Sequence, residues 1–415
     1  MRVRPRRHRA EPLPTAEMPL LSTLLAGGAA AAQAAATLPP VLPGLERRSA
    51  LASVFQKLRD GGPLHILQLG DSHTSADAIA NGLRVPLQAR YGHGGRGALA
   101  PGRPYDNYVT WQVTASQSAG WRVTSWNMPG GVPLGLSGFT QTAGAVGETI
   151  GLTADAPEHR FDRLTICAAT GPGAGAMTLR LGETEQLWSL DARRPGAACR
   201  SIESGAPAAS ASVTTLDARP VSLTSIAVFR RGGGVTVSNL GQIGAQLANF
   251  AQSSDDVLRA ELAAWHPDLI LLAFGTNEGF DPRFTMAGYA HRLRAQVARL
   301  RGLAGPETAI VLVGPPDAAT RSAALPGPDC GEGWHTPSLL TEVRDAQRAL
   351  AAQLHLAFWD WEQAMGGRCS ALTWHQAGLM RDDHVHFNRD GGDLIGRMLF
   401  SDLFEVPDLR PESGG

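Results

Sequence analysis

The sequence predicts an α/β fold in which helices cover both faces of a parallel sheet and an all-β sandwich is inserted. Three observations predict it. Apolar strand-like runs alternate with amphipathic helical patterns after residue 253, and one strand-to-helix pair stands before residue 102. Between residues 102 and 234 the helical periodicity is lost. Catalytic groups of such a sheet belong at the carboxyl ends of its strands.

The first strand-to-helix pair begins with an apolar run between Gly62 and Gly70, which predicts a buried strand over 64–69. Apolar residues then recur at intervals of four from Ile79 to Leu87 and predict a helix, which Pro86 should kink.

The second series begins at Ser254, which can cap a helix that carries Asp255 and Asp256 in its first turn. Pro267 ends that helix. The expected strands are 269–274, 309–313 and 356–361, with helices through 286–300 and 340–354 between them.

The segment 102–234 differs from both flanks because Gly, Ser, Thr, Ala and Pro separate short β-prone runs. It predicts a β-sandwich inserted into the α/β unit. The catalytic domain is then discontinuous, with a first part at 45–101 and a second part at 235–408.

The composition favours a soluble globular protein. Apolar residues make up 43% and charged residues 18% of the 415 residues, and the formal net charge is -1. The near-zero net charge argues against a nucleic-acid partner. No segment is predicted to form a stable membrane span.

Residues 1–36 resemble a secretory signal peptide. Basic residues cluster over 2–9, an Ala/Leu-rich stretch follows, and Ala32-Gln33-Ala34 has the form that a signal peptidase accepts. We therefore expect cleavage near Ala34 or Ala36 and a periplasmic or secreted protein. The alternatives are a low-complexity terminus and a true start of translation near Met18.

The four cysteines show neither a Cys-x-x-Cys pair nor metal-ligand spacing. Export would permit disulfides. We expect Cys167 to pair with Cys199 and Cys330 with Cys369, because each pair lies within one predicted domain.

Ser72 follows the first strand in Gly70-Asp71-Ser72-His73, at a tight turn into a helix where a hydroxyl can be exposed for nucleophilic catalysis. The alternative is a plain helix cap. Thr74 stands where the Gly-x-Ser-x-Gly elbow of α/β-hydrolases needs glycine.

Asp383 stands three residues before His386, so its carboxylate can bind the Nδ1–H of that imidazole and leave Nε2 free to accept a proton. One alternative is a zinc site that uses His384, His386 and a neighbouring Asp. Another is an ordinary surface turn.

Two further segments join these: Asn239-Leu240-Gly241-Gln242-Ile243-Gly244 and Gly275-Thr276-Asn277-Glu278. With Gly-Asp-Ser and Asp-x-x-His, they stand in the block order of the SGNH (GDSL-type) hydrolases, which the sequence resembles. The resemblance implies a flavodoxin-like three-layer fold.

The resemblance also implies the site residues. Ser72 is then the nucleophile, His386 the base and Asp383 its orienting partner. The backbone N–H groups of Ser72 and Gly244 and the Asn277 amide form the oxyanion hole. Such donors typically contribute a hundredfold or more in rate.

The sequence departs from the common blocks at His73, where leucine is usual, and at Glu278, where aspartate is usual. These departures and the large β insertion make the chain resemble the peptidoglycan O-acetylesterases of Gram-negative bacteria. In that branch the inserted domain resembles a carbohydrate-binding module.

Three tryptophans of the insertion, Trp111, Trp121 and Trp126, are candidates for stacking on sugar rings. The alternative is that each belongs to the sandwich core. Gln242 and Asn249 are candidates for substrate contact near the second block.

We therefore expect a carboxylic ester hydrolase that removes acetyl groups from a cell-envelope polysaccharide, with O-acetylated peptidoglycan as the leading substrate. The reaction would pass through acetyl-Ser72 without metal or organic cofactor. The alternatives are an esterase for acyl lipids or another glycan, an O-acetyltransferase with the same triad, and an inactive glycan-binding protein.

Overall fold

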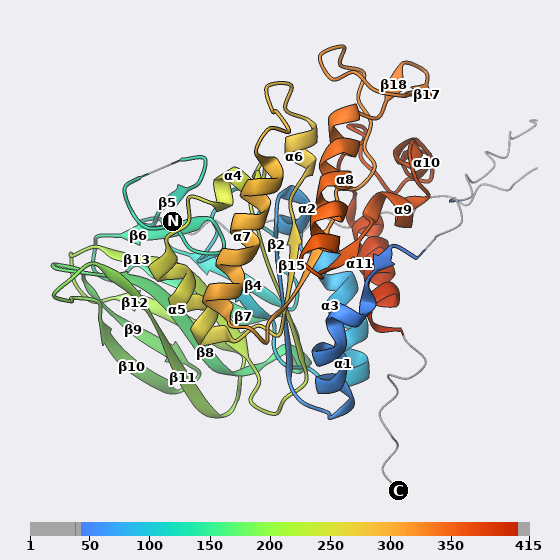
Figure 1. Cartoon of the computed structure of the whole chain (residues 1–415). Helices are drawn as coiled ribbons and strands as arrows, with labels where there is room; N and C mark the ends of the chain where they lie inside the picture. Colours follow the sequence, from blue (N-terminus) through green and yellow to red (C-terminus); the bar gives the residue numbers. More distant parts are fainter. Residues whose placement is uncertain (1–37, 39–42, 129, 406–415) are drawn as a thin grey trace, which may run out of the picture. The chain divides into compact units, whose positions relative to one another are not determined.

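The computed structural model describes residue 38 and residues 43–128 and 130–405 (Figure 1). The expected signal peptide, residues 1–36, lies outside the described residues. Within the described ranges, no helix combines the length and apolarity that a bilayer crossing requires.

The central sheet has the strand order β1-β19-β16-β15-β2-β14. The strands from β19 to β14 run parallel, and β1 joins the edge antiparallel to β19. The bounds are β1 Leu45–Glu46, β2 Leu64–Gly70, β14 Val235–Gly241, β15 Leu269–Ala273, β16 Ala309–Val313 and β19 Ala357–Trp359. The predicted parallel sheet is confirmed, and β2 and β14 pair across the long intervening β segment.

The apolar strands are buried on both faces, as a sheet between two helical layers requires. Neighbouring residues of β2 alternate between the layers: Ile66 packs into one core and Leu67 into the other. The same alternation holds for Leu271 and Ile270 of β15.

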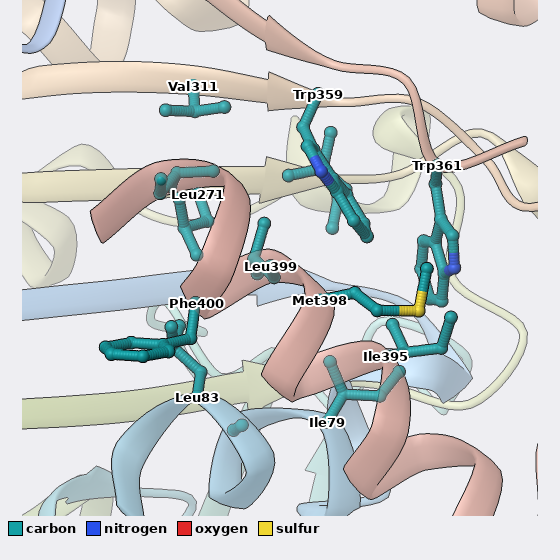
Figure 2. Packing of buried hydrophobic residues seen from close by; sticks show 14 of the residues in the cluster. Ile79, Leu83, Leu271, Val311, Trp359, Trp361, Ile395, Met398, Leu399 and Phe400 are labelled. Atoms are coloured by element: carbon teal, nitrogen blue, oxygen red, sulfur yellow. The ribbon is translucent and has the colours of Figure 1, made fainter. Parts of the chain in front are cut away.

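One face of the sheet is covered by α1 (Ala52–Arg59), α3 (Ala78–Tyr91) and α11 (Arg389–Phe404), whose apolar residues meet Leu271, Val311 and Trp359 (Figure 2). The other face is covered by α5 (Asp255–Trp265), α7 (Tyr289–Ala304) and α8 (Ser338–Gln353). The helix α3 continues through Pro86. Ser254 occupies the predicted N-cap position of α5, but its side chain makes no capping hydrogen bond.

The helices α3 and α11 cross at very close range. A Cβ atom at Gly82 would lie 2.3 Å from the Asp393 carbonyl oxygen, and one at Gly396 would lie 2.2 Å from that of Ile79. Glycine therefore lets the two backbones touch. This crossing fixes the start of α11, directly after the Asp383–His386 segment, against the helix that follows Ser72.

The chain between α3 and β14 forms two antiparallel sheets, with strand orders β10-β9-β12-β7-β4 and β11-β8-β13-β6-β5, and with β3 paired to β13. An apolar core lies between them, containing Leu152, Ile166, Leu179 and Val213. The bounds are β3 Gly97–Leu99, β4 Val113–Gln117, β5 Arg122–Ser125, β6 Phe139–Ala143, β7 Thr149–Ala154, β8 Phe161–Thr170, β9 Ala176–Leu181, β10 Thr184–Ser189, β11 Gly196–Ala208, β12 Ser210–Thr215 and β13 Val221–Phe229.

The β11-β8-β13 sheet also contacts the α/β layer, because α5 packs on β11 and β8. Cys167 and Phe229 belong to the core that contains α5 and α7. The antiparallel sheets therefore share a packed interface with the central sheet's helices.

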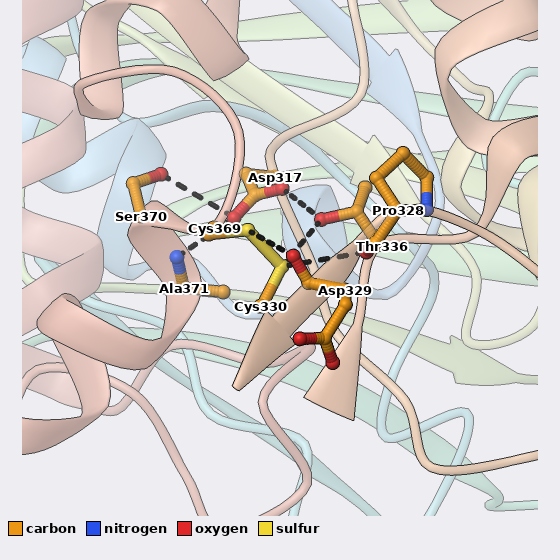
Figure 3. The surroundings of a disulfide bond; sticks show 8 residues. All are labelled: Asp317, Pro328, Asp329, Cys330, Thr336, Cys369, Ser370 and Ala371. Atoms are coloured by element: carbon orange, nitrogen blue, oxygen red, sulfur yellow. Dashed lines mark hydrogen bonds between the residues drawn. A yellow bond between two sulfur atoms is a disulfide. The ribbon is translucent and has the colours of Figure 1, made fainter. Parts of the chain in front are cut away.

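The remaining short elements are η1 Arg48–Leu51, α2 Ser72–Ser75, η2 Pro157–His159, α4 Leu247–Phe250, α6 Thr276–Gly279, β17 Asp329–Gly331, β18 Trp334–His335, α9 Trp361–Met365 and α10 Ser370–Gln376. Both predicted disulfides are present. Cys167–Cys199 joins facing residues of β8 and β11, and Cys330–Cys369 ties the β17–β18 ribbon to the start of α10 (Figure 3).

Candidate active site

The first three sequence blocks meet because three neighbouring strands of the central sheet end at the same edge. Gly70 at the end of β2 pairs with Gly241 on β14 and with Ala273 on β15. Each strand then turns out of the sheet at this edge. Ser72, Gly244 and Asn277 follow these ends within a few residues, so one edge of the sheet carries all three.

The turn that presents Ser72 depends on the small size of Gly70 and on a helix cap from Asp71. A Cβ atom at Gly70 would lie 2.3 Å from Thr74 Oγ1 and 2.4 Å from the Ala273 carbonyl oxygen, so the turn admits only glycine there. Asp71 then caps the short helix α2 by accepting the His73 N–H at 3.0 Å. Ser72 becomes the first residue of α2.

The structure brings together Ser72, His386 and Asp383. Ser72 Oγ lies 2.9 Å from His386 Nε2, and His386 Nδ1 lies 2.7 Å from Asp383 Oδ2. These are hydrogen-bond distances in the order that a nucleophile, a base and an orienting carboxylate require. The arrangement is able to remove the Ser72 proton and hold the resulting imidazolium.

Asp383 also organises its own turn. Its Oδ1 accepts the backbone N–H groups of Val385 and His386, each at 2.9 Å. Partial burial alone would raise the pKa of Asp383, but the hydrogen bonds from His386 and Val385 outweigh burial and lower it. The carboxylate is therefore ionised over the neutral range.

The predicted oxyanion donors lie on connected loops. Ser72 begins α2, so its N–H has no acceptor within that helix. Gly244 adopts a left-handed conformation with φ of 75° in the loop after β14. The Asn277 amide donates one hydrogen bond to the Ala245 carbonyl oxygen at 3.0 Å, which ties it to the Gly244 loop and leaves its second N–H for a ligand.

Glu278, which replaces the usual aspartate, stabilises the same loop. Its Oε1 accepts the Leu247 N–H at 2.7 Å, and the side chain is buried. Burial, with a smaller contribution from the Asp71 charge, raises the pKa of Glu278 to about 7. The residue is a structural bridge between the second and third blocks.

A pocket of about 620 Å³ opens over Ser72 and His386. Its walls come from α2, the start of α3, the 105–111 segment, Ile243 and the residues around the start of α11. Tyr105 and Trp111 therefore bring the connection between β3 and β4 directly to the nucleophile. No sequence pattern predicts this wall, because the segment between β3 and β4 forms neither helix nor strand.

A buried ionic network adjoins this pocket. Asp77 accepts hydrogen bonds from Arg84 at 2.7 Å and from Arg96 at 3.0 Å, and all three side chains are at most 2% exposed. Burial alone would raise the pKa of Asp77, but the two guanidinium groups lower it. No sequence motif records this network, because Asp77 and Arg84 of α3 meet Arg96 only through the packing of that helix against the segment before β3.

The network connects the nucleophile turn to the pocket wall. The Asn239 side chain accepts from Arg96 at 2.6 Å and donates to the Thr74 carbonyl oxygen at 2.8 Å. Asp77 accepts the Trp111 N–H at 2.8 Å, and Arg96 donates to the Trp111 carbonyl oxygen at 3.0 Å. Asn239, the first residue of the second block, therefore positions the turn after Ser72 relative to the Trp111 wall.

Other candidates are separated from the pocket. Trp121 and Trp126 are 5% and 4% exposed and belong to apolar cores, so of the three tryptophans only Trp111 lines the pocket. Gln242 is buried, and Asn249 forms a capping box with Gln246, so neither is the expected substrate contact.

The residues of the alternative zinc site do not converge. The His384 ring packs against Trp334 and His375, with centroid distances of 3.9 and 4.2 Å, while His386 binds Ser72. Across the described ranges, no cluster of three or more His, Cys, Asp or Glu residues has an arrangement that would hold a metal ion.

A parallel α/β sheet with these blocks at its strand ends defines a carboxylic ester hydrolase of the SGNH type. Residues 214–394 match the model of the GDSL-like lipase/acylhydrolase family. The matched range includes Gly244, Asn277, Asp383 and His386 and begins after Ser72.

The structure is similar to one described as a peptidoglycan O-acetylesterase in action, with 28% identity and a TM-score of 0.69. The similarity covers 86% of this chain and 94% of the other. A putative GDSL-like lipase from Parabacteroides merdae is 20% identical over 41% of this chain and 73% of its own, with a TM-score of 0.32. A family two carbohydrate esterase from Clostridium thermocellum is 10% identical over 63% and 93%, with a TM-score of 0.30. No curated protein sequence matches the chain.

Proposed function

We propose that the protein is an exported serine esterase that removes O-acetyl groups from a cell-envelope polysaccharide, most specifically peptidoglycan. The observation that carries the proposal is the continuous hydrogen-bonded series Ser72–His386–Asp383 at the floor of an open pocket. The similarity to a peptidoglycan O-acetylesterase supports the choice of substrate.

The proposed reaction has two halves. His386 Nε2 takes the Ser72 proton as Oγ attacks the acetyl carbonyl carbon, and His386 returns the proton to the departing sugar oxygen. Water, deprotonated by the same imidazole, then attacks the carbonyl carbon of acetyl-Ser72; the bond to Oγ breaks, His386 returns the proton to Oγ, and acetate leaves. The Ser72 and Gly244 N–H groups and the Asn277 amide stabilise the oxyanion in both halves.

We also propose the domain division 45–101, 102–234 and 235–408, in which the middle segment is an inserted sandwich that helps to bind polymer. Its antiparallel sheets and its contribution of Trp111 to the pocket support this division. Export of the protein is supported by the two disulfides, which persist in oxidising compartments.

The test compares acetate release from O-acetylated peptidoglycan, acetylated xylan and a long-chain ester. We expect the highest kcat/KM on peptidoglycan, and we expect Ser72→Ala to abolish it. Ser210→Ala, which changes an exposed serine on β12, is the matched control and should be silent. Preference for the long-chain ester would contradict the polysaccharide substrate, and unchanged activity of Ser72→Ala would contradict the mechanism.

A further inference from the structure

Two arginines line the pocket that contains Ser72 and His386. Within the described ranges, the side chains of Arg381 and Arg389 form no ion pair and no hydrogen bond. Arg389 makes a single cation–π contact, with its guanidinium carbon 4.9 Å from the centroid of the Trp111 ring. Asp106 is the exposed acidic residue among those that line the pocket, so the two exposed arginines outnumber it there.

Trp111 is a rigid platform for Arg389. Its N–H and its carbonyl oxygen are both bound by the buried network, through Asp77 at 2.8 Å and Arg96 at 3.0 Å. A guanidinium that stacks through its face keeps its in-plane N–H groups free, and these groups match the two oxygens of a carboxylate. The contact with Trp111 therefore orients Arg389 and leaves its donors open to the pocket.

We propose that Arg389, held on Trp111, and Arg381 form a subsite for a carboxylate of the acetylated glycan. The enzyme then selects acidic over neutral acetylated glycans. Val109 and Ile243, both exposed and in the same lining, suit the C–H face of the sugar. This inference rests on the proposed function, because it concerns the substrate of the same site.

The test uses one polymer in two charge states: O-acetylated peptidoglycan, and the same material after its carboxylates have been converted to primary amides. We expect kcat/KM of the wild-type enzyme to fall about tenfold on amidation, the size of one charge-assisted contact in a partly exposed site. Arg389→Gln should lose about tenfold on the native polymer and nothing further on the amidated one. Its loss on a small activated acetyl ester, which has no carboxylate, should be smaller than its loss on the native polymer.

Arg259→Gln, which changes an exposed arginine of α5 outside the pocket, is the matched control and should keep the wild-type preference. Equal wild-type rates on native and amidated polymer would overturn the carboxylate subsite and leave the proposed function standing. Cleavage of the small ester without acetate release from either polymer would overturn the proposed substrate and the subsite with it.

A second inference concerns His73, the residue after the nucleophile. Its Nδ1 lies 3.2 Å from Asp71 Oδ1, and its Nε2 lies 2.9 Å from the Val385 carbonyl oxygen. A carboxylate and a carbonyl are both acceptors, so both ring nitrogens must carry a proton. Burial alone would lower the pKa of His73, but the hydrogen bond and charge of Asp71 outweigh burial and raise it.

The His73 ring stacks on the catalytic imidazole. Its centroid is 5.3 Å from that of His386, with an interplanar angle of 26°, and the rings of Trp361 and Phe387 enclose its other sides. The charged groups that act on His73 are Asp71 and, at longer range, Asp383. The leucine of the common block could pack here but could not bind Val385.

We infer that His73 is a positioning residue that links the nucleophile turn to the base loop. It binds the residue before His386 while its own backbone follows Ser72 directly. The link keeps Oγ and Nε2 at hydrogen-bond distance.

The test is His73→Leu, which restores the common block, measured on a small activated acetyl ester. We expect kcat to fall about tenfold or more with little change in KM. His73→Gln should recover part of kcat, since its amide is able to donate to the Val385 carbonyl oxygen.

The matched control is His65→Leu. His65 is also buried, with both ring nitrogens bound, to the Trp265 carbonyl oxygen and to Ser238, but it lies near the other end of β2. It should lower thermal stability and leave kcat and KM on this ester in place. If His73→Leu keeps the wild-type kcat, or if His65→Leu lowers kcat as much, the positioning role is wrong.

Discussion

Replacement of Asp383 separates two roles that the structure gives to one side chain. Oδ2 holds the His386 imidazole, and Oδ1 holds the backbone N–H groups of residues 385 and 386. Asp383→Asn is able to keep the two backbone bonds through its amide oxygen. Its NH2 group then faces Nδ1 and forces the proton to Nε2, where His386 no longer accepts the Ser72 proton.

The two substitutions should therefore differ in stability more than in rate. For Asp383→Asn we expect a loss in kcat of about ten-thousandfold, the effect of the wrong tautomer in a serine triad, with a nearly unchanged melting temperature. Asp383→Ala loses both backbone bonds as well. Because the carboxylate is partly exposed, this should lower the free energy of unfolding by about 1 kcal/mol.

The assay is turnover of an activated acetyl ester at pH 7, with thermal melting of the same preparations. The lowered pKa of Asp383 keeps it ionised well below neutrality, so loss of its charge by titration does not enter at this pH. An Asn variant that retains more than about a hundredth of the wild-type kcat would refute the tautomer argument. An Ala variant that melts with the wild-type protein would refute the structural role of Oδ1.

Three further predictions follow from the site and the fold. Ser72→Ala and His386→Ala should each cost about ten-thousandfold or more in kcat, and the double variant little more than either alone, because the residues act as one unit; additive losses would contradict this. Burial raises the pKa of Glu261 to about 7, so ionisation opposes folding and stability falls as pH rises from about 4.5 to 7. Over this pH range the ionisation of Glu261 costs roughly 3 kcal/mol of unfolding free energy, and Glu261→Gln should remove that cost. A dependence of unfolding free energy on pH that is the same for the variant and the wild type, measured by urea titration, would contradict this. Removal of the Cys330–Cys369 disulfide, whose cysteines are 39 residues apart, should lower the free energy of unfolding by about 4 kcal/mol in the chain-entropy account, and denaturant midpoints equal to the wild type would contradict that.

The features that the sequence predicts well are those with a local physical cause. The strands β15 and β16 are continuous apolar runs, and the helices between the later strands have clear amphipathic periods, so their existence follows from pattern alone. Asp383 and His386 are predictable as a pair because three residues of separation let one side chain reach the other.

The features that escape prediction depend on tertiary contacts that no residue spacing records. The Asp77–Arg84–Arg96 network and the Trp111 wall join the start and the body of α3 to the irregular segments on either side of β3. Trp111, Trp121 and Trp126 look alike in sequence. Only the packing of the sheets separates the pocket residue from the two core residues.

His73 illustrates a different limit. In the sequence, His73 stands where the common block has leucine. That difference alone does not show which groups the histidine side chain binds. The structure supplies the missing partners, Asp71 and the Val385 carbonyl oxygen, and the second of these lies 312 residues away in the chain.

The central claim is that the acetyl group passes through Ser72. The most direct test is intact mass spectrometry of the enzyme after mixing with O-acetylated peptidoglycan and acid quenching within one turnover, followed by peptide mapping. We expect the mass increase of one acetyl group on the peptide that contains Ser72, and no increase for Ser72→Ala. Acetate release by a Ser72→Ala variant that a chelator then inhibits, with no acetylated enzyme, would contradict it.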